Sequence, residues 1–209
     1  MRRAGVILAL DVNGTKRAVE VVGQTAEYID AIKVGYPLVL SAGLDVITEL
    51  KQFNLPIIAD FKVADVPHVS AEICRLATEA GADFVIVQGV MGRDVVEACS
   101  KEASLFVVSD MSHPGALDYI SGHNREIASH AAGFAEGIVA PATRPQTIKT
   151  LRSIIGDLIV ISPGVKAQGA EVGSAISAGA DFEIIGRAIC NSPDPRGAAE
   201  QIKNEIKSS

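Results

Sequence analysis

The segment Ala80-Gly81-Ala82-Asp83-Phe84 is repeated without change towards the other end of the chain, as Ala178-Gly179-Ala180-Asp181-Phe182. In each copy the glycine lies between a helix-like stretch and an apolar run. We therefore expect a helix to end there, with the glycine in the left-handed conformation, and a strand to follow. Two identical junctions of this kind indicate a chain built from repeated helix and strand units.

Short apolar runs recur along the whole chain at fairly even intervals. They predict eight strands, at Val6–Leu10, Ala31–Val34, Pro56–Phe61, Phe84–Val87, Leu105–Val108, Gly137–Ala140, Leu158–Ile161 and Glu183–Ile185. Amphipathic stretches between them predict helices, for example at Leu38–Lys51, Val69–Ala80, Thr147–Ile155 and Ala198–Lys207. The runs are mostly continuous in apolar residues, which is typical of parallel strands that are covered on both faces.

Eight units of about 26 residues fit one closed (β/α)8 barrel of the TIM type. We predict a single domain over residues 1–209, because no Ser/Gly-rich or Pro-rich linker divides the chain. A doubly wound open sheet is the alternative. The glycine-rich turn that such sheets use for dinucleotides is missing, since Asp11-Val12-Asn13-Gly14-Thr15 holds one glycine.

Composition excludes several classes of protein. Aromatic residues make up 4% of the 209 residues, there is no tryptophan, and the net charge is −6, which argues against nucleic-acid binding. No apolar run has the length of a membrane span. Cys74, Cys99 and Cys190 are odd in number and far apart, and they suit neither a disulfide framework nor a zinc site. We therefore expect a cytoplasmic protein.

Active groups of such barrels lie at the carboxyl ends of the strands. The polar residues at those positions are Asp11, Lys33, Asp60, Lys62, Asp65, Gln88, Ser112, His113, Gln168 and Arg187.

The end of the third predicted strand is the most informative of these sites. Asp60 and Lys62 are two residues apart, so both side chains should face the barrel axis if Ile57 and Phe61 face the helices. A lysine held ionised by carboxylates can protonate a carbanion. The structural alternatives are a simple salt-bridge network, or Asp65 as the N-cap of the following helix.

The motif Asp60-Phe61-Lys62-Val63-Ala64-Asp65-Val66 resembles the D-F-K-x-x-D-I signature of the orotidine 5′-phosphate decarboxylase family, in its short archaeal form. Further matches follow in order from residue 6 to residue 190. They are Ile7–Asp11, Ile32–Leu38, Met111–Ala116, Ile161–Val165 with Gln168-Gly169, and Ile185–Arg187. Each match is weak alone, but the joint set is specific.

The resemblance implies decarboxylation of orotidine 5′-phosphate to UMP and CO2, in de novo pyrimidine biosynthesis, without metal or organic cofactor. It implies that Lys62 protonates C6, that Asp60 lies beside the leaving carboxylate and that Lys33 orients Asp60. It also implies a homodimer, in which Asp65 reaches into the site of the partner.

The resemblance also assigns the residues that bind the substrate. Asp11 would bind a ribose hydroxyl and Ser112 the pyrimidine ring. Gln168 and Arg187, with backbone N–H groups near Gly186, would bind the phosphate.

The sequence departs from the family pattern at three positions. Val69 replaces a threonine that helps to bind the ribose across the interface, Gln88 replaces a common histidine, and Lys166 stands where glycine is common. These departures put the ribose contact and the closure of the phosphate loop in question, but they leave the lysines and aspartates intact.

Two other functions are open. A sugar-phosphate decarboxylase or aldolase of the same suprafamily would bind Mg²⁺ through a glutamate where this chain has Lys33, whose charge would repel the metal. A catalytically silent barrel could bind a nucleotide for regulation. Retention of Lys33, Asp60, Lys62 and Asp65 argues against it.

Overall fold

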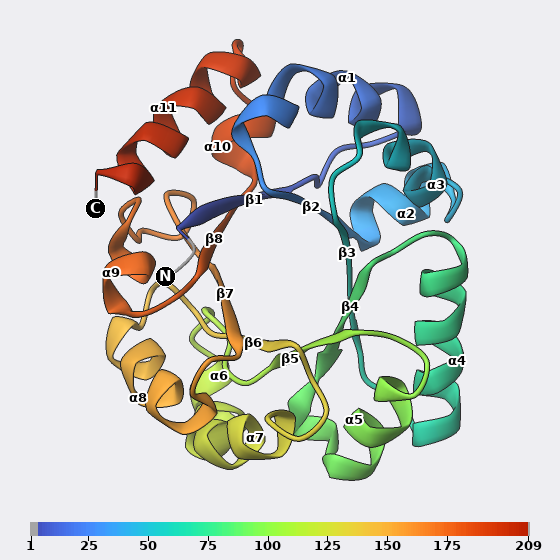
Figure 1. Ribbon diagram of the computed structural model, residues 1–209, viewed down its shortest axis with the longest axis vertical. Coiled ribbons are helices and arrows are strands. Elements are labelled where there is room, and N and C mark those ends of the chain that lie inside the picture. The colour runs from blue at the N-terminus through green and yellow to red at the C-terminus, as the bar shows by residue number, and fades with distance from the viewer. Residues whose placement is uncertain (1–3, 209) are drawn as a thin grey trace.

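The computed structural model describes residues 4–208, and its strands form a closed parallel barrel in chain order. The strands are β1 (Gly5–Ala9), β2 (Ala31–Gly35), β3 (Ile57–Val63), β4 (Phe84–Gln88), β5 (Leu105–Val108), β6 (Gly137–Val139), β7 (Ile159–Pro163) and β8 (Phe182–Ile185). Parallel pairing of β1 with β8 closes the ring, and the helices surround it (Figure 1). The (β/α)8 prediction is confirmed, and the open sheet is excluded. The predicted bounds 1–209 stay a prediction, because residues 1–3 and 209 lie outside the described part.

The outer layer consists of helices that follow the strands. The α-helices are α1 (Thr15–Thr25), α2 (Tyr36–Ala42), α3 (Val46–Leu50), α4 (Pro67–Glu79), α5 (Arg93–Ser100), α6 (Ala116–Tyr119), α7 (Asn124–Ala131), α8 (Pro145–Ile155), α9 (Ser174–Ala178), α10 (Arg187–Cys190) and α11 (Pro195–Lys207). Short 3₁₀ helices are η1 (Ala26–Tyr28), η2 (Lys51–Phe53), η3 (Gly89–Met91) and η4 (Ser121–His123). Among residues 4–208, no helix combines the length and hydropathy of a membrane span.

One helix prediction is wrong. The stretch expected as a single helix over Leu38–Lys51 forms α2, α3 and η2, because the chain turns at Gly43 with a φ of 84°. Only glycine adopts that conformation without strain. The other three expected helices exist but begin two or three residues earlier, each at a proline. Proline suits the first turn of a helix, where its missing N–H leaves no bond unmade.

The strands carry two apolar faces. On β3, Ile57, Ala59, Phe61 and Val63 pack against the helices, whereas Ile58 packs inside the barrel. The interior is filled by apolar side chains that alternate with the outward ones, namely Ile7, Ala9, Ala31, Ile58, Ile86, Phe106, Val108, Val139, Ile161 and Ile184. This plug leaves room for polar groups only at the ends of the strands.

The repeated Ala-Gly-Ala-Asp-Phe segments explain how neighbouring strands are joined at their amino ends. Gly81 and Gly179 have φ values of 108° and 113°, as predicted. The aspartate then forms a reciprocal pair with the preceding strand. Asp83 donates its N–H to the Ile57 carbonyl at 2.8 Å, and its Oδ2 accepts the Ile57 N–H at 2.7 Å.

The second copy repeats this geometry. Asp181 donates its N–H to the carbonyl of Val160 at 2.9 Å, and its Oδ2 accepts the Val160 N–H at 2.8 Å. Asp30, which lies outside the repeat, does the same with Val6, at 2.8 Å in both directions. Aspartate therefore fixes the register of three strand pairs at the end of the barrel opposite to the predicted site.

We predict that Asp181→Ala lowers the free energy of unfolding by about 2 kcal/mol and Asp83→Ala by about 1 kcal/mol. Each variant loses the carboxylate that accepts a backbone N–H and that also pairs with a cation, Arg152 for Asp181 and Lys51 for Asp83. The order follows from exposure, since the Asp181 side chain is 15% exposed and that of Asp83 is 40% exposed. Urea unfolding would measure both. Equal or reversed losses would contradict this account of the repeat.

Candidate active site

A pocket of about 450 Å³ opens at the carboxyl ends of the strands. Side chains on a strand alternate between its two faces, so a residue two positions after one that packs in the barrel interior faces the same side. The polar side chains of the pocket occupy such positions. The residue pairs with this spacing are Ala9 and Asp11, Ala31 and Lys33, Ile58 and Asp60, and Val108 and Asp110. Of the polar candidates at the strand ends, Asp65, Gln88 and His113 do not line the pocket. The predicted residues that line it are Asp11, Lys33, Asp60, Lys62, Ser112, Gln168, Gly186 and Arg187.

Asp60 joins two lysines on the floor of the pocket. Its Oδ2 accepts from Lys33 Nζ at 2.6 Å, and Lys62 Nζ lies 2.8 Å from Oδ1 and 3.0 Å from Oδ2. Lys33 and Asp60 are buried, whereas the Lys62 side chain is 40% exposed. Lys62 is therefore the lysine that a ligand can reach. Lys33 is buried and holds the Asp60 carboxylate by its hydrogen bond to Oδ2.

The charge of Asp60 is stabilised in this position. Burial alone would raise the pKa of the Asp60 carboxyl, but the positive charges of Lys33 and Lys62, and their hydrogen bonds, outweigh burial and hold that pKa below its usual value. Asp60 is consequently ionised at neutral pH. The ionised carboxylate lies 2.8 Å from Lys62 Nζ and fixes the position of that side chain at the pocket.

The backbone of β3 is strained at Lys62. Its φ is 42°, a left-handed value that costs a non-glycine residue about 1–3 kcal/mol. The pairing of β3 with β4 is irregular over the same stretch, between Ala59 and Val63. Lys62 still faces the same side of the strand as Asp60, as the spacing of two residues predicts. The strain therefore coincides with the charged group that faces the pocket.

Asp65 lies in the loop after β3 and is exposed. Its Oδ1 accepts the N–H of Val66 at 2.6 Å, and Ser70 Oγ bonds to both its backbone N and its carbonyl. The N-cap residue of α4 is Val66, and no side chain forms a capping hydrogen bond with this helix. The alternative interpretation of Asp65 as a helix N-cap is therefore wrong.

The opposite side of the pocket is formed by the loop after β7 and the start of α10. Arg187 Nη2 donates to the carbonyl of Ala167 at 3.0 Å, so the arginine lies against the tip of that loop. A methyl group added at Gly164 would lie 3.3 Å from Gln168 Oε1 and 3.7 Å from Ser112 Cβ. Gly164 thus lets the loops that carry Gln168 and Ser112 approach each other.

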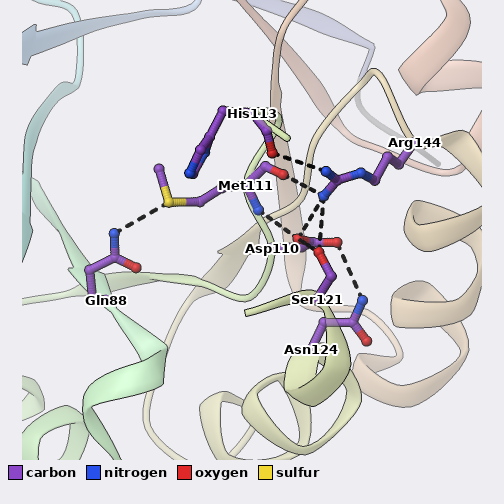
Figure 2. Close-up of polar contacts among 7 residues, drawn as sticks. All are labelled: Gln88, Asp110, Met111, His113, Ser121, Asn124 and Arg144. Atoms are coloured by element: carbon purple, nitrogen blue, oxygen red, sulfur yellow. Dashed lines mark hydrogen bonds and ion pairs between the residues drawn. The ribbon is translucent and has the colours of Figure 1, made fainter. Parts of the chain in front are cut away.

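The loop that carries Ser112 is held by a buried carboxylate that the sequence analysis missed. Asp110 Oδ1 accepts from the Met111 N–H at 2.8 Å, from Ser121 Oγ at 2.7 Å and from Arg144 Nη1 at 3.0 Å. Asn124 Nδ2 donates to Oδ2 at 3.3 Å. Figure 2 shows Asp110 between these groups. The signal was present, because Asp110 follows Val108 by two residues at the end of β5.

Arg144 comes from the loop after β6 and could not be linked to Asp110 from the sequence. Besides Asp110, its guanidinium donates to the carbonyls of Met111 at 2.6 Å and His113 at 3.1 Å (Figure 2). The backbone on both sides of Ser112 is therefore fixed by one arginine. His113 takes part in this network through its backbone carbonyl.

Gln88 lies at the end of β4, beside the same loop. Its Nε2 is 3.5 Å from Met111 Sδ, a weak contact (Figure 2). Its Oε1 is buried and has no hydrogen-bond partner within the described residues. Residues 4–208 contain no group of three His, Cys, Asp or Glu side chains arranged to hold a metal ion.

The closed barrel and its charged pocket define the chain as a (β/α)8-barrel enzyme. Residues 5–202 match the model of the orotidine 5′-phosphate decarboxylase / HUMPS family. The chain is 50% identical to an orotidine 5′-phosphate decarboxylase of Methanosarcina mazei, over 99% of this chain and 96% of that protein. It belongs to this family, as the motifs predicted.

Solved structures of this family have the same fold as this chain. The orotidine 5′-monophosphate decarboxylase of Methanocaldococcus jannaschii, in complex with the inhibitor BMP, superimposes with a TM-score of 0.93 at 38% identity and 99% coverage of both chains. The orotidine 5′-phosphate decarboxylase of Pyrococcus horikoshii gives 0.91 at 41% identity, with 97% of this chain and 99% of that chain covered.

Proposed function

We propose that the protein decarboxylates orotidine 5′-phosphate to UMP and CO2, in pyrimidine biosynthesis, with Lys62 as the proton donor. The observation that carries this proposal is the array of Lys33, Asp60 and Lys62 on the floor of the pocket. Family membership and 50% identity to a decarboxylase over nearly the whole chain support the same reaction.

The array suits the chemistry of this decarboxylation. When the bond between C6 and the carboxylate breaks, CO2 leaves and the electron pair stays on a ring carbon that delocalises it poorly. A fixed ammonium beside C6 stabilises that charge as it develops. Lys62 then gives a proton to C6, while Asp60 and Lys33 keep its ammonium in place. No electron acceptor or added group is needed to balance this step.

The rest of the pocket supports binding of a nucleotide at its phosphate end. The loop after β7 and the short helix α10 after β8 meet there, and this is a common phosphate site in such barrels. We assign Arg187, Gln168 and the backbone near Gly186 to the phosphate. Arg187 would exchange its bond to the Ala167 carbonyl for a charge-assisted bond to phosphate.

The ribose and pyrimidine positions follow from the same orientation. Asp11 lines the pocket beside β1 and would bind a ribose hydroxyl. Ser112 lies on the loop braced by Asp110 and Arg144 and would bind the pyrimidine ring. Lys33 disfavours the Mg²⁺-dependent sugar-phosphate reaction. Its positive charge lies at the end of β2, where that reaction needs a metal ligand, and it is already paired with Asp60.

The proposal includes a homodimer in which Asp65 enters the site of the partner. Asp65 is exposed and lies outside its own pocket. Large apolar side chains stand exposed on the neighbouring segments after β2, β3 and β4, namely Tyr36, Val66, Val90 and Met91. A second copy covering these residues would bury Asp65 near a site. A cytoplasmic location is part of the proposal, and three free, buried cysteines support it.

The direct test of the reaction is the loss of ultraviolet absorbance when the protein is mixed with orotidine 5′-phosphate. We predict that Lys62→Ala reduces turnover at least about 10²-fold, because the positioned proton donor is lost, while UMP still binds. Turnover within a factor of a few of the wild type would remove Lys62 from the mechanism.

For Arg187→Ala we predict a loss of kcat/KM equivalent to about 1.5–3 kcal/mol with orotidine 5′-phosphate, because a charge-assisted contact is removed. Decarboxylation of orotidine, which has no phosphate, should be unchanged. Steady-state rates with both compounds measure the difference. Equal damage to both reactions would show that Arg187 acts away from the phosphate.

Subunit mixing tests the shared site. We predict that Lys62→Ala and Asp65→Ala proteins, each inactive alone, regain activity after dissociation and reassociation together. In a mixed dimer one site carries both changes and the other carries neither. Random pairing makes about half of the dimers mixed, so activity should approach about a quarter of the wild-type value. Proven exchange without recovery would mean that Asp65 does not serve the partner.

A further inference from the structure

Glu183 is a fully buried carboxylate that the proposed reaction does not use. It lies on β8, where Ile184 faces the barrel interior, so Glu183 points outward into the helix layer. Its Oε2 accepts the N–H of Gly173 at 2.9 Å, and its Oε1 accepts the N–H of Ala175 at 2.9 Å. Both donors belong to the entry into α9.

Burial of this carboxylate is costly, which points to a function for its position. Burial raises the pKa of Glu183, and hydrogen bonds from the backbone of Gly173, Ala175 and Ile176 offset only part of that effect. No cation within the described residues forms an ion pair with it. A serine or aspartate at the helix start could satisfy the same N–H groups at lower cost. What Glu183 adds is a link from α9 to β8.

That link fixes the exit of the loop that forms the phosphate end of the pocket. The loop runs from Gly164 to Gly173, and both glycines have positive φ values, 106° and 84°. Its tip is held by Arg187, whose guanidinium donates to the Ala167 carbonyl. Arg187 is the first residue of α10, two residues after the end of β8, so the loop is held at its exit by β8 and at its tip by the segment that follows β8. Figure 1 shows β8 beside β7 and α9.

We propose that Glu183 is a positioning residue for the phosphate site, which sets the loop of residues 164–173 against Arg187 through the N–H groups of Gly173 and Ala175. The inference rests on the proposed function only in taking phosphate as the ligand of this loop. Glu183 touches no part of the pocket and acts through the backbone. Its loss should therefore affect interactions with the phosphate group and leave the Lys62 array intact.

The experiment compares wild type and Glu183→Gln with ligands that differ only in the phosphate. In the variant, an amide nitrogen replaces one carboxylate oxygen and cannot accept from a backbone N–H. We expect kcat/KM for orotidine 5′-phosphate to fall about tenfold, because small displacements of positioning groups have effects of that order or more. The rate with orotidine should stay within about twofold of wild type on the same argument.

Binding gives a second readout that does not depend on turnover. Calorimetry should show weaker binding of UMP by the variant and unchanged binding of uridine. Amide exchange at Gly173 and Ala175 should become faster. Failure of the wild type to consume orotidine 5′-phosphate would contradict the proposed function, whereas the comparison of UMP with uridine decides the role of Glu183 in either case.

Thr25→Val is the matched control, because Thr25 is also buried and bonds only to carbonyls of α1, far from the pocket. It should lower stability without changing the ratio between the two substrates. If Glu183→Gln does not fold, Glu183→Asp keeps the charge but withdraws it by one methylene, and the same selective loss is expected. Equal losses with and without phosphate, or no loss, would overturn the proposal.

Discussion

The bond network between Asp60 and two lysines is the constraint on which the site depends. Two ammonium groups at the mouth of an apolar barrel would repel each other, and a carboxylate between them removes that repulsion. Barrel closure makes this possible, because β2 and β3 are paired so that Lys33 and Asp60 face the same interior. The apolar side chains that fill the barrel interior confine the charges to the mouth, where the Lys62 side chain is 40% exposed.

Aspartate has opposite roles at the two ends of the barrel. At the amino ends of the strands, Asp30, Asp83 and Asp181 pair with the backbone of a neighbouring strand and stabilise the fold. At the carboxyl ends, Asp60 and Asp110 bind side chains that belong to the site. The separation lets the pocket hold strain, such as the left-handed backbone at Lys62, because stability is supplied elsewhere.

The two halves of the pocket are supported by different long-range contacts. On one side, Asp110 and Arg144 join the loops after β5 and β6 and fix the backbone around Ser112 (Figure 2). On the other side, Arg187 at the start of α10 donates to the Ala167 carbonyl in the loop after β7. A rigid support of this kind keeps catalytic groups within the narrow geometry that rate enhancement requires. In each half an arginine from a segment after a strand binds backbone carbonyl oxygen of another loop: Arg144 binds two such groups and Arg187 binds one.

The sequence by itself determined the eight strands, the barrel and most of the polar residues of the pocket, because strand periodicity and motif spacing are local properties of the chain. The break at Gly43, the left-handed Lys62 and the partners of Asp110 and Glu183 were decided by the tertiary structure. Arg144 is 34 residues from Asp110 in the chain, so no local pattern links them. Such pairs depend on how neighbouring strands are aligned, which is fixed only when the barrel closes.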